Sequence, residues 1–291
     1  MRLWENYFAM VLLGLVLGIA TGGFPAYARE ASTAALVFAM TFSLTEVRFQ
    51  GISGRAEFRS FARALALNYG LLTSVILGLS VLYPDPAIRR GWVVMAAVPS
   101  AVAVVPITSA LKGNVRSALV SSAFLYVAAL AAFPLITFGF AGQAANPVDV
   151  GVQILLQIGL PLAASRSLAG RPAVTRHRPV LVNVSFFVLV FALAGANRSV
   201  FVQTPTLVLS LVGGGFLRTW AVGLAILAVT RWRGFAREER LTDALFGTLK
   251  NLGLAALLGF SLFGAAAALP AIVSLFFEIA WVLALSRFLA A

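Results

Sequence analysis

The chain has 291 residues, 60% of them hydrophobic and only 11% charged, whereas a soluble globular chain carries about 25% charged residues, so most of this chain must face lipid. Its formal net charge of +12 would favour nucleic-acid binding in a soluble protein, but here the basic residues stand between apolar segments, where they act as topology signals and predict no nucleic-acid partner. With no cysteine and one histidine, His177, in an arginine-rich loop, the sequence excludes cysteine-bound metals and disulfides, and we expect neither an enzyme nor a metal or other cofactor.

A helix needs about 20 apolar residues to cross the hydrocarbon core of a bilayer. The chain contains ten such runs joined by short loops, and strands of alternating polarity are absent, so it predicts an all-α membrane protein. The predicted spans are 4–24, 31–47, 61–83, 91–112, 116–140, 147–165, 179–197, 205–230, 241–264 and 268–289.

The loops between these spans predict an orientation. With an even number of spans, both termini lie on one side of the membrane, and most basic residues fall on that side. The other side has Arg29, Arg89, Arg90 and Arg198. Cytoplasmic loops are enriched in Lys and Arg. We therefore expect cytoplasmic termini in a multi-pass protein of the cell inner (plasma) membrane.

Ten spans divide into two halves of five, 1–140 and 141–291, and the second half then crosses the membrane in the opposite sense to the first. Inverted repeats of this kind are common in secondary transporters. Sequence similarity between the two halves is weak, so the repeat is a structural expectation.

Three charged residues lie inside predicted spans: Arg218 in the eighth, Lys250 in the ninth and Glu278 in the tenth. A charge at the centre of a bilayer costs about 2.5–3.5 kcal/mol on insertion scales, so such residues normally face protein or water. They line a path for a solute or proton, or Glu278 merely neutralises Lys250 or Arg218.

The fourth and ninth spans are interrupted. The fourth has Pro99 and Pro106, followed by Thr108, and each proline removes a helical hydrogen bond. The ninth has small and polar residues from Gly247 to Gly253. Interruptions at matching positions of two halves are a pointer to a transporter site, although close packing by small residues is the alternative.

Several of these segments resemble the bile acid:sodium symporter family. The stretch 98–114 is similar to that family's fourth-helix crossover, Pro-Gly-Gly-Thr-x-Ser-Asn with a later Leu-x-Lys-Gly-Asp-like end. The stretch 250–255, Lys-Asn-Leu-Gly-Leu-Ala, is similar to its ninth-helix motif Glu-x-x-x-Gln-Asn-x-Gly-Leu-Ala. Segments 38–44, 268–270 and 274–279 resemble its second and tenth helices, so the match follows the order of the spans.

The resemblance implies a fold with a panel domain (helices 1, 2, 6 and 7) and a core domain (helices 3, 4, 5, 8, 9 and 10). Helices 4 and 9 are broken and cross in the core, where sodium binds. The solute sits between core and panel. By the same resemblance Glu278 takes the place of an amide beside the solute cavity, and Arg218 lies near a polar position of the eighth helix.

The family's sodium ligands are mostly missing from this chain. The Ser-Asn pair of the fourth helix falls on Val104 and Val105, and the ninth-helix Glu falls on Phe246. One of two fifth-helix hydroxyls falls on Ala118. The positions that stay polar are Ser122 in the fifth helix, Asn68 for a third-helix Gln, and Lys250 for a ninth-helix Gln. Hard cations need several oxygen ligands, so we expect a bacterial homologue with degenerate sodium sites.

Lys250 then places a tethered positive charge where sodium would sit, with Glu278 as its counter-charge and Asn251, Asn68 and Ser122 as polar contacts. A positive pocket made by Arg218 and Lys250 would suit a small organic anion. The sequence therefore predicts a secondary transporter of such an anion that is not coupled to sodium. Because burial disfavours a charged amine, a proton-linked exporter or antiporter is one alternative, and a membrane protein that binds a solute without transporting it is another.

Overall fold

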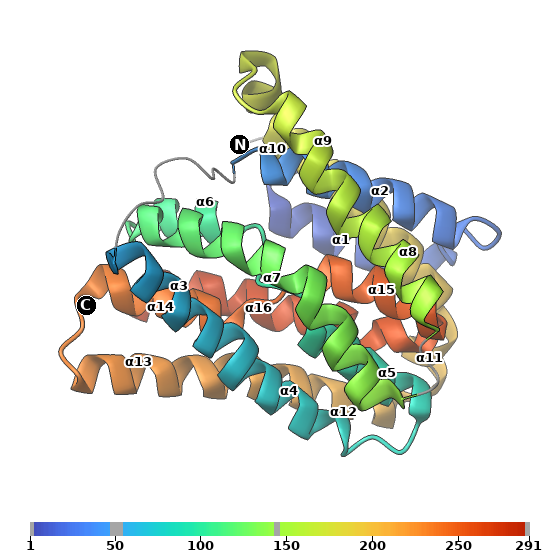
Figure 1. Ribbon diagram of the computed structural model, residues 1–291. Coiled ribbons are helices and arrows are strands. Elements are labelled where there is room, and N and C mark those ends of the chain that lie inside the picture. Colours follow the sequence, from blue (N-terminus) through green and yellow to red (C-terminus); the bar gives the residue numbers. More distant parts are fainter. Residues whose placement is uncertain (1–2, 47–54, 143–145, 289–291) are drawn as a thin grey trace.

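The structure is a computed structural model that describes residues 3–46, 55–142 and 146–288, except for the side chains of 55–57 and 286–288. Residues 47 and 289, the ends of two predicted spans, lie outside this part. The described residues form helices and no strands, as expected (Figure 1). The α-helices are α1 (Tyr7–Thr21), α2 (Ala28–Ser43), α3 (Arg55–Leu65), α4 (Thr73–Ser80), α5 (Pro86–Ala97), α6 (Val104–Ala110), α7 (Val115–Ala141), α8 (Pro147–Ile154), α9 (Leu160–Leu168), α10 (Pro172–Ala196), α11 (Arg198–Gln203), α12 (Pro205–Phe216), α13 (Val222–Trp232), α14 (Arg237–Thr248), α15 (Leu252–Phe263) and α16 (Leu269–Phe288).

Three long helices contain a widened, π-helical turn. These turns are η3 (Ala66–Leu72) between α3 and α4, η5 (Leu155–Gly159) between α8 and α9, and η6 (Leu217–Ala221) between α12 and α13. Short 3-10 turns are η1 (Leu3–Glu5), η2 (Leu44–Glu46) and η7 (Ala265–Ala268). π-Helical turns inside α-helices occur often at functional sites, and two of these three carry a buried polar residue that bears on the site.

Polar side chains start several helices by accepting hydrogen bonds from free main-chain N–H groups. Asn6 caps α1 through the amides of Phe8 and Ala9, and Asp85 caps α5 in front of Pro86. Prolines at the first position fit because that position needs no N–H donor.

Seven helical segments of the described chain are long and apolar enough to span a bilayer. Three predicted spans fall short. α1 has 15 residues and α2 has 16, which corresponds to about 24 Å at most against a hydrocarbon core of about 30 Å. The predicted span 91–112 is divided between α5 and α6. The seven segments are Phe58–Ser80, Val115–Ala141, Pro147–Leu168, Pro172–Ala196, Pro205–Trp232, Arg237–Phe263 and Ala265–Leu285.

The helices pack in two groups. α10 lies along both α1 and α2, and α9 packs on α2 (Figure 1). In the larger group α3 and α5 pack on α7, α12 packs on α16, and α13 packs on α14. α15 contacts α5 and α16 in the larger group and also α2 and α10 in the smaller one. This position places α15, and the chain break before it, at the junction of the two groups.

Glycines bring α1 and α10 into main-chain contact. A methyl group on Gly195 would lie 2.4 Å from the carbonyl carbon of Gly22, and one on Gly14 would lie 2.7 Å from the carbonyl oxygen of Phe187. Both distances are shorter than atoms tolerate, so these positions require glycine. The smaller group is therefore closely packed along this contact.

Candidate functional site

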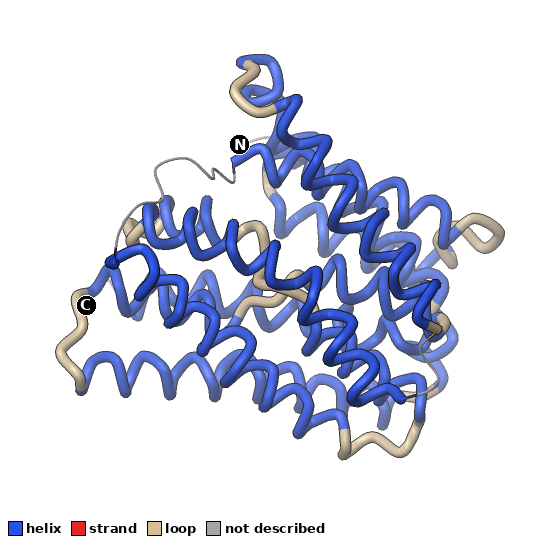
Figure 2. Tube along the Cα trace, viewed as in Figure 1, coloured by secondary structure: helices blue, strands red, loops and turns tan. Residues whose placement is uncertain are grey.

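Two helix interruptions meet in the interior of the protein. Between α5 and α6 the chain is extended from Val98, and between α14 and α15 it is extended from Leu249. The main-chain N–H of Asn251 donates to the carbonyl oxygen of Pro99 at 2.9 Å. Figure 2 shows the two loop segments close together within the helical body. The contact of 98–103 with 249–251 is called the crossing here.

Lys250 lies at the crossing with no exposed surface. Its ammonium donates to Asn68 Oδ1 at 3.1 Å, to Thr73 Oγ1 at 3.0 Å, and to the carbonyl oxygens of Ala96 at 2.9 Å and Val98 at 3.0 Å. An ammonium has three protons to donate. Four acceptor oxygens lie within hydrogen-bond distance, so each proton has an acceptor. The charge is thus held by a ring of oxygens rather than by a carboxylate.

An aromatic ring completes this enclosure. The Lys250 nitrogen lies 4.5 Å from the centre of the Tyr69 ring, within the range of a cation–π interaction. The hydroxyl of Tyr69 donates to the carbonyl oxygen of Ala97 at 3.2 Å. Tyr69 therefore touches both the tethered cation and the end of α5.

Asn68 connects Lys250 with the end of the other broken helix. Its Oδ1 accepts from the ammonium, while its Nδ2 donates to the carbonyl oxygens of Phe246 at 2.8 Å and Leu249 at 3.2 Å. Asn68 lies in η3 and is fully buried. The Asn68 side chain therefore donates to two carbonyl groups at the end of α14 and accepts from the Lys250 ammonium at the crossing.

Arg218 and Glu278 form a buried ion pair beside the end of α14. The Arg218 guanidinium donates to Glu278 Oε1 and to the carbonyl oxygen of Thr248 at 3.2 Å. The same carboxylate oxygen accepts from the main-chain N–H of Lys250 at 2.9 Å. The contact of Glu278 with Lys250 is therefore to the main chain, and the ion pair recorded for this carboxylate is with Arg218.

Both broken helices end in carbonyl groups that a helix cannot satisfy itself. The carbonyls at the end of α5 receive the Lys250 ammonium, and those at the end of α14 receive Arg218 and Asn68. The C-terminus of a helix carries a partial negative charge of about half an electron. Two buried cations therefore sit where two helix ends create negative potential.

Asn251 begins α15 and also reaches α7 and α2. Its Oδ1 accepts from the main-chain N–H of Leu254 at 3.1 Å, and its Nδ2 donates to the Tyr126 hydroxyl at 2.8 Å and contacts Met40 Sδ at 3.1 Å. The residue is 4% exposed. Its polar atoms are therefore already used within the protein.

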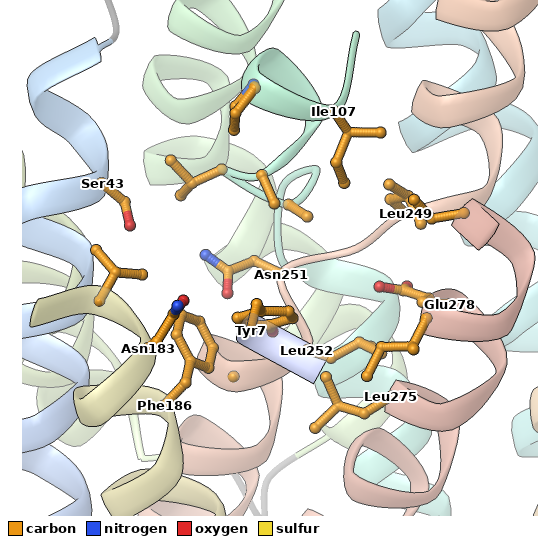
Figure 3. A pocket seen from close by; sticks show the side chains of 18 of the residues that line it. Tyr7, Ser43, Ile107, Asn183, Phe186, Leu249, Asn251, Leu252, Leu275 and Glu278 are labelled. Carbon is orange, nitrogen blue, oxygen red and sulfur yellow. The ribbon is translucent and has the colours of Figure 1, made fainter. Parts of the chain in front are cut away.

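A cavity of about 320 Å³ opens beside the crossing, between the two helix groups. Its wall includes Tyr7 of α1, Asn183 and Phe186 of α10, Asn251 at the crossing and Glu278 of α16 (Figure 3). Figure 3 shows the Glu278 carboxylate and the two amides at the edge of this space. Most of the remaining wall is apolar. The cavity is the part of the described structure best suited to hold a small solute.

A model of the SBF-like CPA transporter family (DUF4137) matches residues 7–291. The chain belongs to this family. The family match confirms the resemblance to bile acid:sodium symporter-like proteins that the broken-helix segments indicated. Members are transporters and not enzymes, so this chain is a multi-pass membrane protein of the transporter class. No curated protein matches the chain.

In this SBF-like CPA transporter the positions at which the resemblance predicts lost sodium ligands are apolar and buried. Val104, Val105, Ala118 and Phe246 are at most 6% exposed and pack in one hydrophobic cluster. Their side chains have no oxygen that a cation could bind. The described residues also contain no group of three or more His, Asp or Glu side chains placed to hold a metal ion.

Two further predicted residues are buried away from the contacts of Lys250. Thr108 donates its hydroxyl to the carbonyl oxygen of Val104 at 2.7 Å, within α6. Ser122 of α7 is fully buried, and its hydroxyl has no hydrogen-bond partner among the described residues. Neither is among the recorded partners of the ammonium.

The expected positive pocket is not found in this transporter. Arg218 has no exposed surface and is not part of the cavity wall. Lys250 is one of the residues that line the cavity, but it has no exposed surface and its ammonium is enclosed by oxygen partners. The charged atoms that reach the cavity from this cluster are those of Glu278, whose side chain is 9% exposed. The reason for expecting an organic anion therefore does not hold.

Sequence reasoning missed several residues of the site. Thr73 and Tyr69 contact the ammonium, and Tyr126 fixes Asn251. Tyr7 and Asn183 come from the smaller helix group and line the cavity. Asn183 is an amide inside the seventh predicted span, which is the signal that could have identified it. Tyrosines are common in membrane helices and give no comparable signal.

Proposed function

We propose that this chain is a secondary transporter of a small organic solute that works by alternating access, with Lys250 in place of a coupling sodium ion. The observation that carries the proposal is the position of the Lys250 ammonium among four oxygens at the crossing. Sodium, as a hard cation, also requires several oxygen ligands. A fixed ammonium satisfies them without a dissociable ion.

Electrostatics supports the loss of sodium coupling. A sodium ion placed near the crossing would lie beside two buried cations, and repulsion between like charges is strong where the dielectric constant is low. Among the described residues around Lys250 and Arg218, Glu278 is the one buried carboxylate that offsets these charges, and it already forms an ion pair with Arg218. A further cation would therefore be unfavourable.

The proposed architecture has ten membrane spans in two inverted repeats, 1–140 and 141–291. The three helices that are too short by length alone, α1, α2 and the α5–α6 pair, would complete the ten. The smaller group of α1, α2 and α8–α10 would be the panel domain, and the larger group would be the core domain. Both termini would be cytoplasmic, in the cell inner membrane, as the distribution of basic residues favours.

Alternating access would then be a rocking of the larger group against the smaller one, as in other carriers with inverted repeats. The cavity lies at the junction between the groups, so this movement would expose it to each side of the membrane in turn. The interior hydrogen bonds of Lys250 and Arg218 all lie within the larger group, and the movement would leave them intact.

A fixed cation is favoured over a proton carrier at position 250. The ammonium has no exposed surface and no recorded contact with the carboxylate of Glu278 through its side chain. A group that exchanges protons with each side needs access to water. The enclosure of Lys250 therefore supports transport without a proton bound and released at this residue.

The absence of cysteine permits a direct test of alternating access. A single cysteine at Ser43 or Leu275 in the cavity should react with a membrane-impermeant maleimide from both sides of the membrane, in vesicles of opposite orientation. Cysteines at Val148 and Arg233, in exposed positions of two different loops or helix ends, serve as controls that should each react from one side only. Reaction of both cavity positions from a single side would contradict transport and favour a solute-binding protein.

A second measurement addresses sodium. The thermal midpoint of the purified protein should be the same in sodium chloride and in potassium chloride of equal ionic strength, because no sodium binds the folded state preferentially. The Lys250→Gln variant removes the ammonium and restores an amide at the crossing. A sodium-dependent rise of the midpoint in the wild-type protein would contradict the proposed role of Lys250.

A further inference from the structure

Two acceptor oxygens at the cavity wall have no hydrogen-bond partner among the described residues, and the hydroxyl groups of Tyr7 and Ser43 line the same wall. Glu278 uses Oε1 for both of its recorded contacts, and Oε2 has no hydrogen-bond partner among the described residues. Asn183 donates Nδ2 to the carbonyl oxygen of Trp4 at 3.0 Å, which leaves its Oδ1 without a recorded partner. Both residues are more than nine-tenths buried, and both line the cavity. Both oxygens can accept a hydrogen bond from a solute that enters the cavity.

The strongest side-chain donors near the cavity are already engaged. The guanidinium of Arg218 and the ammonium of Lys250 bind oxygens inside the larger helix group, and the Asn251 amide donates to Tyr126. Arg178, at the edge of the cavity, pairs with Glu46. A solute carboxylate entering the cavity would meet a carboxylate oxygen before it met an uncommitted cation.

Aromatic rings line the same cavity as the carboxylate. Tyr7 and Phe186 both line the cavity and meet edge to face, with ring centres 5.2 Å apart, and Phe8 lies 5.9 Å from Tyr7 (Figure 3). The faces of aromatic rings attract cations, and the attraction grows where water is excluded. Rings combined with one unsatisfied carboxylate oxygen are the features that recognise an alkylated or protonated amine.

The cavity continues into apolar space. A second cavity of about 180 Å³ lies between α1 and α16 and shares Phe8, Leu275 and Ile279 with the first. All of its lining residues are apolar. A solute that fills both spaces therefore has a hydrophobic body joined to a polar end.

We infer that the solute is a hydrophobic organic cation, an amine or quaternary ammonium whose nitrogen lies against Glu278 and the rings of Tyr7 and Phe186. This inference rests on the proposed transport function and specifies its substrate class. Arg218 binds Oε1 of Glu278, which leaves Oε2 for the solute. The apolar body of the solute extends toward the second cavity.

Direct binding to the purified full-length chain tests this substrate class. The probes are benzyltrimethylammonium, a permanent cation with an aromatic body, and phenylacetate, an anion of similar size. Calorimetry in detergent micelles should show saturable binding of the cation and at least tenfold weaker binding of the anion. A preference for phenylacetate, or no binding of benzyltrimethylammonium at millimolar concentration, would overturn the inference.

Two kinds of variant locate the binding. Glu278→Gln should weaken binding of the cation about tenfold or more, while Glu239→Gln, which alters a carboxylate paired with Arg63 away from the cavity, should leave it unchanged. Because Glu278→Gln also removes the partner of Arg218, a second variant leaves the ion pair intact. Phe186→Leu should weaken binding about tenfold, the size of a desolvated cation–π contact, whereas Phe138→Leu on the exposed side of α7 should not.

A measurement of uptake distinguishes a failure of the substrate class from a failure of the proposed transport function. Uptake of radiolabelled benzyltrimethylammonium into proteoliposomes is measured beside binding. Saturable binding that depends on Phe186, with no uptake, would contradict transport and retain the substrate class. Uptake of phenylacetate in preference to the cation would retain transport and overturn the substrate class.

Discussion

Arg218 and Glu278 form an ion pair almost without access to water, with side chains 0% and 9% exposed. Each charge was taken out of water at considerable cost, and each depends on the other to offset that cost. The pair joins η6 to α16. Through the carbonyl of Thr248 and the main-chain N–H of Lys250 it also holds the end of α14 and the extended segment that follows it.

Removal of either partner alone should be strongly destabilising. We expect Arg218→Met and Glu278→Gln each to lower the free energy of unfolding by about 3–5 kcal/mol, because each leaves an uncompensated buried charge. The double variant should lose clearly less than the sum of the two. Unfolding titrations in mixed detergent micelles measure all three values. Additive losses would show that the two side chains do not interact.

Asn68 should matter more for stability than its size suggests. Asn68→Leu removes one acceptor of the Lys250 ammonium and leaves the carbonyls of Phe246 and Leu249 without this donor. A loss of about 2–4 kcal/mol is expected, since hydrogen bonds to charged groups and unsatisfied buried acceptors both contribute. Thr73→Val, which keeps the shape and removes one hydroxyl, should cost less in the same titration. A larger effect of Thr73→Val would mean that the ammonium depends chiefly on that hydroxyl.

The contact of α1 with α10 predicts a sharp contrast between two glycines. Gly195→Ala would place a methyl group 2.4 Å from main-chain atoms of Gly22 and Gly23, so the two helices must separate and the thermal midpoint should fall. Gly139→Ala in α7 meets nothing within 4 Å. Because alanine favours a helix over glycine by about 1 kcal/mol, this control should be neutral or stabilising. Equal effects of both changes would contradict the close contact.

The sequence predicted the main polar residues because charge inside an apolar segment is conspicuous. Arg218, Lys250 and Glu278 stand alone in their spans, and Pro99 marks a break in the helix. Which charges pair could not be predicted, since Glu278 had two possible partners and the choice depends on how three helices pack. The structure pairs it with Arg218 and directs the Lys250 ammonium to main-chain and amide oxygens.

The π-helical turns were not predictable from residue patterns. Asn68 and Thr73 are five positions apart, which in a regular α-helix places them on different sides. At the end of η3 the main-chain N–H of Thr73, the first residue of α4, donates to the carbonyl oxygen of Asn68, and both side chains contact the same ammonium. Hydrophobic periodicity assumes 3.6 residues per turn, so it cannot identify such a pair. The predicted span 4–24 exceeds α1 at both ends, whereas the predicted span 31–47 begins three residues inside α2 and runs past its end.

The link between Asn251 and Pro99 consists of main-chain atoms only. Replacement of either side chain leaves this bond in place, except that a proline at 251 would remove its donor. The side chains around this main-chain hydrogen bond can therefore differ widely while the bond itself is kept. Side chains at the crossing, such as that of Lys250, can therefore be exchanged in evolution while the two broken helices stay attached to each other through the main chain.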